Sequence, residues 1–175
     1  CENEISRIIE ELARPYVDEI SRDTLGNLIC RRKGTGPKVM FSAHMDSIGL
    51  VATHIDEKGF VRVGAVGGVT PRAVLHTPVR FRSGVCGAVC AAIGADMEKL
   101  TVSDLFIDIG ASGEEEARKL VQVGDAAVFN TPVRQTAGRV IAPYLDDRIA
   151  CLVLLMAMER PLDTDNDLYF VFSVQ

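Results

Sequence analysis

Residues 38–46 read Lys-Val-Met-Phe-Ser-Ala-His-Met-Asp, an apolar run typical of a buried strand that ends in a histidine and an aspartate. Because side chains alternate along a strand, His44 and Asp46 point to the same side. In open α/β sheets, ligands bind outside the carboxyl ends of the strands. The spacing therefore suits a metal ligand, His44, whose second ring N–H is accepted by Asp46. Taken alone, however, such a triplet is more typical of a polar strand end.

A second acidic cluster, Asp146-Asp147-Arg148, stands immediately before a long apolar segment. Two adjacent carboxylates at a helix start are unfavourable unless positive charge faces them. The helix dipole and Arg148 supply a little of that charge, and a bound divalent cation would supply far more. The alternative is an N-cap aspartate followed by a surface ion pair. These residues alone leave both interpretations open.

The composition narrows the classes of partner. The chain has 175 residues and a net charge of -5, and its basic residues are scattered, so we expect no nucleic-acid partner. No apolar stretch reaches transmembrane length, so we expect no membrane partner. The five cysteines stand at unrelated spacings, which favours small buried residues in a protein of the reducing cytoplasm.

The hydrophobic pattern predicts an α/β layer that is interrupted by a β-rich insert. Helical spacing marks residues 4–14, and strands are expected at 28–30 and 38–43. Short strands punctuated by glycine and proline follow, with one helix ending near residue 120. The α/β pattern returns with a strand at 139–142, an apolar helix at 149–159 and an apolar run at 168–174, typical of a central parallel strand covered on both faces. We therefore predict an α/β domain at 1–48 and 128–175, interrupted by a β-rich domain at 49–127.

Five segments together resemble metallopeptidase family 42, which holds the tetrahedral (TET) aminopeptidases, the glutamyl aminopeptidases and proteins labelled endoglucanase. The segments are 22–28, 42–50, 53–60, 105–111 and 145–148, and they follow the family's order over essentially the whole chain. The resemblance implies a zinc-peptidase-like α/β sheet domain interrupted by a β-barrel lid that mediates dimerisation. It also implies hydrolysis of N-terminal residues from peptides by a metal-activated water, in a homo-oligomer of two to twelve subunits.

The resemblance also implies roles for single residues. His44 would ligate one of two divalent metal ions, zinc or cobalt, and Asp146 would bridge the two ions. Asp46 would be the catalytic carboxylate that orients His44 and raises its basicity. The family often has a cis peptide between the residues that correspond to Asp146 and Asp147.

The sequence departs from the family at several positions. The family strand equivalent to 168–174 is followed by Glu-Glu, a general base and a metal ligand, whereas the last residue here is Gln175. The family has further aspartate and histidine ligands downstream of this position. It also has a first segment that would precede Cys1 and is missing from this sequence. The family usually has Glu where this chain has Ser47. We therefore expect a fragment, truncated at both ends and inactive alone, whose general base and remaining ligands lie outside this chain.

Two rival functions remain open. The first is a catalytically inactive homologue or scaffold that acts through its lid interface. The second is a glycosidase, as the endoglucanase label suggests, although two carboxylates flanking a sugar bond would not require a histidine-ligated metal.

Overall fold

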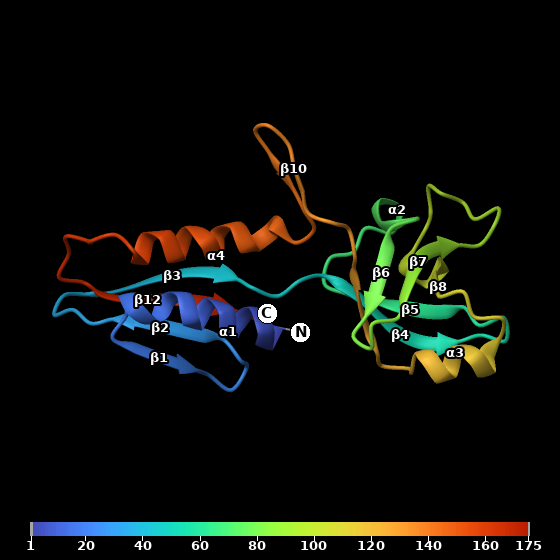
Figure 1. The fold of residues 1–175 in the computed structure, drawn as a ribbon, viewed down its shortest axis with the longest axis horizontal. Coiled ribbons are helices and arrows are strands. Elements are labelled where there is room, and N and C mark those ends of the chain that lie inside the picture. Colours follow the sequence, from blue (N-terminus) through green and yellow to red (C-terminus); the bar gives the residue numbers. More distant parts are fainter. Residues whose placement is uncertain (1, 175) are drawn as a thin grey trace. The chain divides into compact units, whose positions relative to one another are not determined.

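The structure is a computed structural model that describes residues 2–174, and it divides into two compact units (Figure 1). One unit combines the chain up to Ser47 with the chain from Tyr144 onward. The other unit is the intervening segment, Ile48–Pro143.

The first unit, the sheet unit, is a four-stranded sheet with strand order β1-β2-β12-β3. Strand β12 runs parallel to β3 and antiparallel to β2, so it is central in the sheet. The elements of the unit are α1 (Glu2–Ala13), η1 (Arg14–Tyr16), β1 (Glu19–Arg22), β2 (Leu28–Arg32), β3 (Lys38–His44), α4 (Leu145–Met158) and β12 (Asp167–Ser173).

The hydrophobic core of the sheet unit lies on one face of this sheet. Leu168, Phe170 and Phe172 alternate along β12, all three are buried, and they pack with buried side chains of α1 and α4. Burial of apolar surface contributes roughly 25 cal/mol per Å², so these large side chains dominate the stability of the unit. The core therefore fixes α4 against the sheet and sets where the start of α4 lies.

The opposite face of the sheet differs from the prediction that β12 is covered on both faces. Tyr169 and Val171 point to that face and are only half-buried, because α1 and α4 both pack on the other face. Two cationic side chains lie over the ring of Tyr169 instead. The Arg31 guanidinium is 5.3 Å and the Lys38 ammonium 5.9 Å from the centroid of Tyr169. Arg31 and Lys38 thus cover part of the sheet face that a second layer of helices would otherwise cover.

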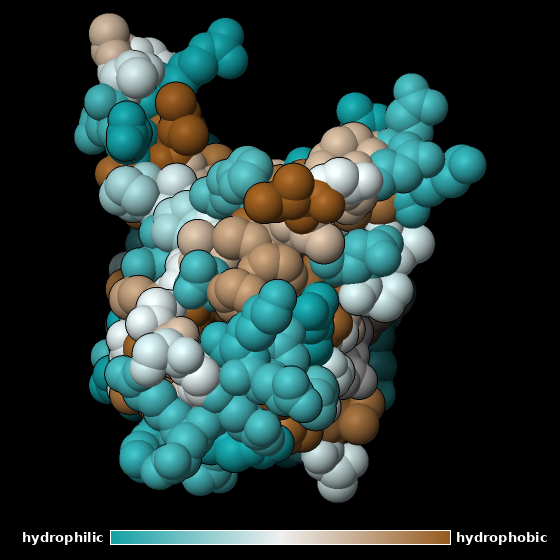
Figure 2. All heavy atoms as spheres, turned by 90° about the vertical axis from the view of Figure 1, so that its right-hand side faces the viewer, coloured by the Kyte–Doolittle hydropathy of each residue, from teal (hydrophilic) through white to brown (hydrophobic). Residues whose placement is uncertain are grey.

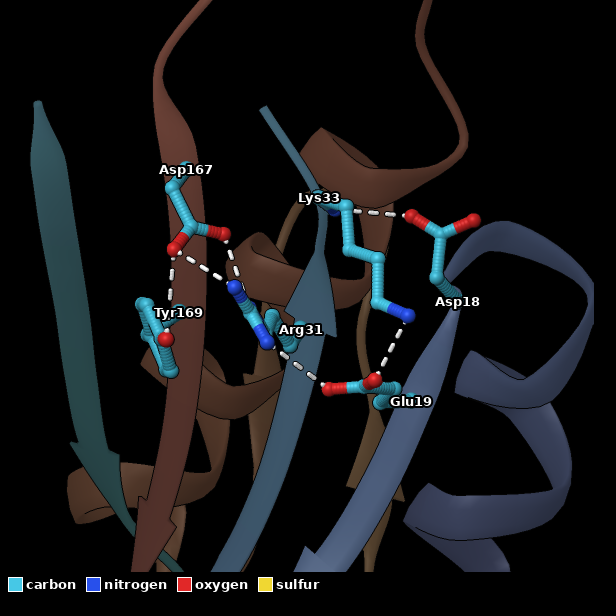
Figure 3. Close-up of polar contacts among 6 residues, drawn as sticks. All are labelled: Asp18, Glu19, Arg31, Lys33, Asp167 and Tyr169. Atoms are coloured by element: carbon cyan, nitrogen blue, oxygen red, sulfur yellow. Dashed lines mark hydrogen bonds and ion pairs between the residues drawn. The ribbon is translucent and has the colours of Figure 1, made fainter. Parts of the chain in front are cut away.

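A charged network on this open face joins three strands (Figure 3). Asp167 is buried and accepts hydrogen bonds from Arg31 Nε at 2.8 Å, from Arg31 Nη2 at 2.9 Å and from the Tyr169 hydroxyl at 3.2 Å. Glu19 extends the network to Arg31 Nη1 at 3.0 Å and to Lys33 Nζ at 2.6 Å. The hydrogen bonds from Arg31 outweigh the effect of burial and hold the pKa of Asp167 below its ordinary value.

We expect Asp167→Asn to lower the melting temperature at neutral pH, and the difference from the wild type to close in acid. Because the folded state lowers the pKa of Asp167, its contribution is present above the ordinary carboxyl pKa of about 3.9 and is lost as the pH falls through the folded value. Melting curves from pH 7 to pH 3 measure this. The exposed Asp163→Asn serves as the control, and a difference that stays constant across this range would contradict the account.

The second unit, the barrel unit, is a closed six-stranded barrel in the order β4-β5-β8-β7-β6-β9. Together with the sheet unit it confirms the predicted fold class, an α/β sheet domain combined with a β-barrel. No described helix in either unit has both the length and the apolar character needed to cross a membrane. The elements are β4 (Gly49–Ile55), β5 (Val61–Val66), α2 (Pro71–Val74), β6 (Pro78–Phe81), β7 (Cys86–Ala91), η2 (Val102–Asp104), β8 (Leu105–Asp108), α3 (Glu114–Leu120), β9 (Ala126–Phe129), β10 (Arg134–Gln135) and β11 (Val140–Ile141).

The second boundary between the units lies later in the chain than the predicted boundary between residues 127 and 128. Strand β9 runs across that point and pairs with β4 and β6 of the barrel. The strand predicted at 139–142 is β11, which pairs with β10 in an exposed hairpin and does not join the α/β sheet. The sheet unit therefore resumes at Tyr144, because the hairpin contributes no buried side chain to it.

We expect Gly34→Ala to destabilise the sheet unit by about 3 kcal/mol. A Cβ atom at Gly34 would lie 2.2 Å from the carbonyl oxygen of Asn166 and 2.3 Å from that of Asp165, and backbone atoms cannot rotate away. Gly138→Ala is the matched control, because a Cβ atom there meets nothing within 4 Å. Urea unfolding of the two variants measures the difference, and equal stability of both would show that the backbone contact at Gly34 is unimportant.

Candidate metal centre

The three predicted site residues meet within the sheet unit. His44 is the last residue of β3, Asp46 lies two residues beyond it, and Asp146 lies in the first turn of α4. Helix α4 packs along β3, and the Cys151 thiol in this helix donates a hydrogen bond of 3.3 Å to the carbonyl oxygen of His44. The packing of α4 on the sheet therefore brings Asp146 to the end of β3, although the barrel unit separates the two segments in the sequence.

The imidazole of His44 lies between two carboxylates. Its Nδ1 is 3.2 Å from Asp46 Oδ1, and its Nε2 is 3.4 Å from Asp146 Oδ1. Asp46 Oδ1 is buried and has no hydrogen bond within residues 2–174, because its contact with His44 is short enough but poorly directed. The Asp146 side chain, in contrast, is 96 % exposed.

This donor set fits a divalent cation. In the tautomer that carries its proton on Nδ1, facing Asp46, His44 has a free lone pair on Nε2. This lone pair lies beside an oxygen of Asp146, and the two atoms together attract a cation placed between them. Imidazole nitrogen and carboxylate oxygen are both ordinary ligands of divalent metal ions. Within residues 2–174, however, no group of three or more histidine, cysteine, aspartate or glutamate side chains is arranged to hold a metal ion. In the described part of the chain, His44 and Asp146 are thus the two side chains that face a cation position, and Asp46 lies beside the other ring nitrogen of His44.

Neighbouring residues tie the end of β3 to the start of α4. The peptide between Asp146 and Asp147 is cis, as the resemblance implies. Asp147 Oδ2 accepts a hydrogen bond of 3.4 Å from the backbone N–H of His44. Arg148 donates a hydrogen bond of 3.3 Å to Ser47, the residue that stands where the family usually has Glu. The Arg148 guanidinium lies 5.6 Å from the centroid of the Tyr144 ring and makes no ion pair with Asp146 or Asp147 in the described residues, so it does not supply the positive charge that these carboxylates were predicted to need.

Sequence reasoning treated Cys151 only as a small buried residue and missed its contact with the site. Burial raises the pKa of the Cys151 thiol to about 11, and the nearby charge of Asp147 acts in the same direction. The thiol therefore stays protonated at neutral pH and remains a hydrogen-bond donor to His44. No local sequence pattern signalled this contact, because it depends on how α4 packs against β3.

The chain is similar to known proteins along nearly its whole length. The family model of the M42 glutamyl aminopeptidases matches residues 26–175. A predicted aminopeptidase of Acetivibrio thermocellus is 46 % identical over 175 residues, which cover 99 % of this chain and 53 % of that protein. The chain thus spans about half the length of the curated relatives it matches.

Solved structures give the same result for the fold. An aminopeptidase from the archaeon Desulfurococcus kamchatkensis matches with a TM-score of 0.88 and 36 % identity, over 99 % of this chain and 51 % of that one. The TET1 peptidase of Pyrococcus horikoshii, which can assemble into a tetrahedron or a large octahedral shell, matches with a TM-score of 0.81 and 32 % identity, over 99 % of this chain and 56 % of that one.

Proposed function

Because this chain belongs to the family of M42 glutamyl aminopeptidases, we propose that it is part of a metal-dependent aminopeptidase that removes N-terminal residues from peptides. One observation carries the proposal. Nε2 of His44 and Oδ1 of Asp146 lie 3.4 Å apart at the end of β3, while Asp46 lies beside the other ring nitrogen.

Each of these side chains has a distinct role in the proposed site. His44 and Asp146 hold the metal, and Asp46 fixes the orientation of the His44 ring and raises its basicity. Asp147 accepts the backbone N–H of His44 and keeps the end of β3 beside α4. A divalent cation held there would polarise the substrate carbonyl and would lower the pKa of a bound water to about 7.

The site needs residues from outside this chain. Catalytic metal sites usually have at least three protein ligands, whereas the described residues contain no group of three or more candidate ligands and offer His44 and Asp146. The curated relatives are about twice as long as this chain. We propose that a polypeptide of that length supplies the remaining ligands, the general base and a second metal ion, zinc or cobalt.

The proposal extends to assembly and location. The barrel unit would serve as the lid, and the whole protein would form a homo-oligomer, from a dimer to twelve subunits, as the relatives that build shells suggest. Cys30, Cys86, Cys90 and Cys151 are free thiols, which suits a reducing compartment such as the cytoplasm.

Two alternatives make different predictions. A scaffold without activity would need no convergence of His44, Asp46 and Asp146, so the geometry favours the enzyme. A glycosidase would place two carboxylates on either side of an open cleft for a sugar. Here Asp46 and Asp146 lie on either side of one imidazole, which favours a metal site.

The test is a chimera in which residues 1–175 are followed by the part of the Acetivibrio thermocellus relative beyond the matched region. With zinc or cobalt, we expect the chimera to cleave aminoacyl-nitroanilides and to leave carboxymethylcellulose intact. Cleavage of the polysaccharide would favour the glycosidase. A folded chimera that binds metal and cleaves neither substrate would favour the scaffold.

A further inference from the structure

The carboxyl end of β12 lies beside the candidate metal centre. Ser173, the last residue of β12, pairs with His44, the last residue of β3, and the two strands run parallel. The backbone N–H of Met45 extends this pairing, because it donates a hydrogen bond of 2.8 Å to the carbonyl oxygen of Ser173. Functional groups gather where the carboxyl ends of neighbouring parallel strands meet. The end of β12 therefore belongs to the same edge of the sheet as His44.

On the side away from β3, a side chain holds this end of β12. Strand β2 begins at Leu28, which pairs with Phe172, so the regular pairing between β2 and β12 stops there. Just beyond it, Asn27 Oδ1 accepts a hydrogen bond of 2.9 Å from the backbone N–H of Val174. The amide of Asn27 thus continues the attachment of β12 at the point where backbone pairing ends.

The turn between β1 and β2 holds the Asn27 side chain in place. Asn27 Nδ2 donates a hydrogen bond of 2.8 Å to Asp23 Oδ2, while Asp23 Oδ1 accepts the backbone N–H groups of Leu25, Gly26 and Asn27, each at 3.0 Å. The hydrogen bond from the Asn27 side chain is the largest cause that holds the pKa of Asp23 below its ordinary value, so Asp23 is an ionised acceptor at neutral pH. One orientation of the Asn27 amide satisfies both partners, with its N–H₂ toward Asp23 and its oxygen toward Val174.

We propose that Asn27 is a positioning residue of the aminopeptidase site, because it fixes the carboxyl end of β12 next to His44 from the side opposite β3. Asn27 acts through the backbone N–H of Val174 and takes no part in holding the metal. A reacting group that is misplaced by about 1 Å can lose roughly 100-fold in rate, so groups that follow β12 in the longer polypeptide need a fixed strand end. This inference rests on the proposed function and adds a residue to its site.

A reciprocal exchange of the two side chains tests this role in the metal-saturated chimera. Asn27→Asp turns a carboxylate toward Asp23, so we expect it to break the contact and to lower kcat by about 10-fold to 100-fold. KM should change little, because the lost interaction matters in the transition state. Asp23→Asn should have a similar effect, because it turns an amide N–H₂ either toward that of Asn27 or toward the backbone N–H groups of the turn. The double variant exchanges donor and acceptor, so it should restore kcat.

Asn130→Ala is the control for Asn27→Ala, which removes the amide altogether. Asn130 is exposed in the barrel unit, and hydrophilic side chains cover much of the side of that unit that Figure 2 turns toward the viewer. We expect Asn27→Ala to lower kcat and Asn130→Ala to leave it unchanged. If Asn27→Ala lowered the melting temperature alone and kept the kcat of the folded protein, its role would be structural and the proposal would be wrong.

Hydrogen exchange of the chimera, followed by mass spectrometry of peptides that contain Val174, tests the contact without any measurement of activity. Asn27→Ala should speed exchange in these peptides, whereas Asn130→Ala should not, because the amide of Val174 loses its acceptor only in the first variant. Unchanged exchange in Asn27→Ala, or a double variant that keeps the low kcat of the single ones, would refute this inference alone. A folded, metal-loaded wild-type chimera without turnover would instead refute the proposed function.

Discussion

Turnover of an aminoacyl-nitroanilide by the chimera is expected to fall by about 10³-fold or more when His44 is replaced by alanine. The reason is that a catalytic metal stabilises the transition state by several kcal/mol, and each 1.4 kcal/mol or so is a factor of ten in rate. Asp146→Asn should have a comparable effect, because it removes charge from the second ligand. Steady-state kinetics and metal content of the purified variants, measured together, test both.

A matched histidine provides the control for this prediction. His76 is exposed, lies in the barrel unit, and stands at no position that corresponds to a family ligand. His76→Ala should therefore keep both metal content and turnover. If His44→Ala kept its metal content while His76→Ala lost it, the assignment of the site would be wrong.

The largest expected effect on stability belongs to Phe170→Ala, at about 3–5 kcal/mol. Phe170 is 1 % exposed in the centre of the sheet core, so its removal leaves a cavity that the neighbouring side chains cannot fill. Urea unfolding followed by far-UV circular dichroism measures this loss.

Phe41 is a comparison within the same ring pair. Its ring stacks on that of Phe170 with 5.5 Å between centroids, but Phe41 is 42 % exposed at the edge strand β3. Phe41→Ala should therefore cost only about 1 kcal/mol. Equal losses from the two substitutions would mean that the described core is not where the stability of the sheet unit lies.

Much of the sheet unit could be predicted from local patterns. The apolar run before His44 and the run at 168–174 are β3 and β12. Asp46 lies beyond the end of β3, and its Oδ1 is 3.2 Å from His44 Nδ1, in agreement with the prediction that the two side chains lie together. The convergence of Asp146 with His44 was predictable because both lie next to strand or helix ends on either side of an insert. The roles of these residues were predicted from the family resemblance and stay predictions.

Other features depend on contacts that no local pattern encodes. The apolar residues at 168–174 did not predict that Arg31 and Lys38 would lie over Tyr169. This contact depends on which strands become neighbours of β12 in the sheet. The pair Val140-Ile141 resembles a strand of the α/β layer, yet among residues 2–174 it pairs with β10 and not with a strand of the sheet unit. The contact between Cys151 and His44 likewise follows from how α4 packs on β3.

Calorimetric titration of zinc into the 175-residue chain tests the central claim most directly, which is that His44 and Asp146 form one part of a metal site completed elsewhere. With two protein ligands, water must fill the remaining coordination positions, so we predict weak binding that His44→Ala abolishes and no peptidase turnover. Tight, stoichiometric binding of two metal ions, accompanied by turnover, would contradict this account.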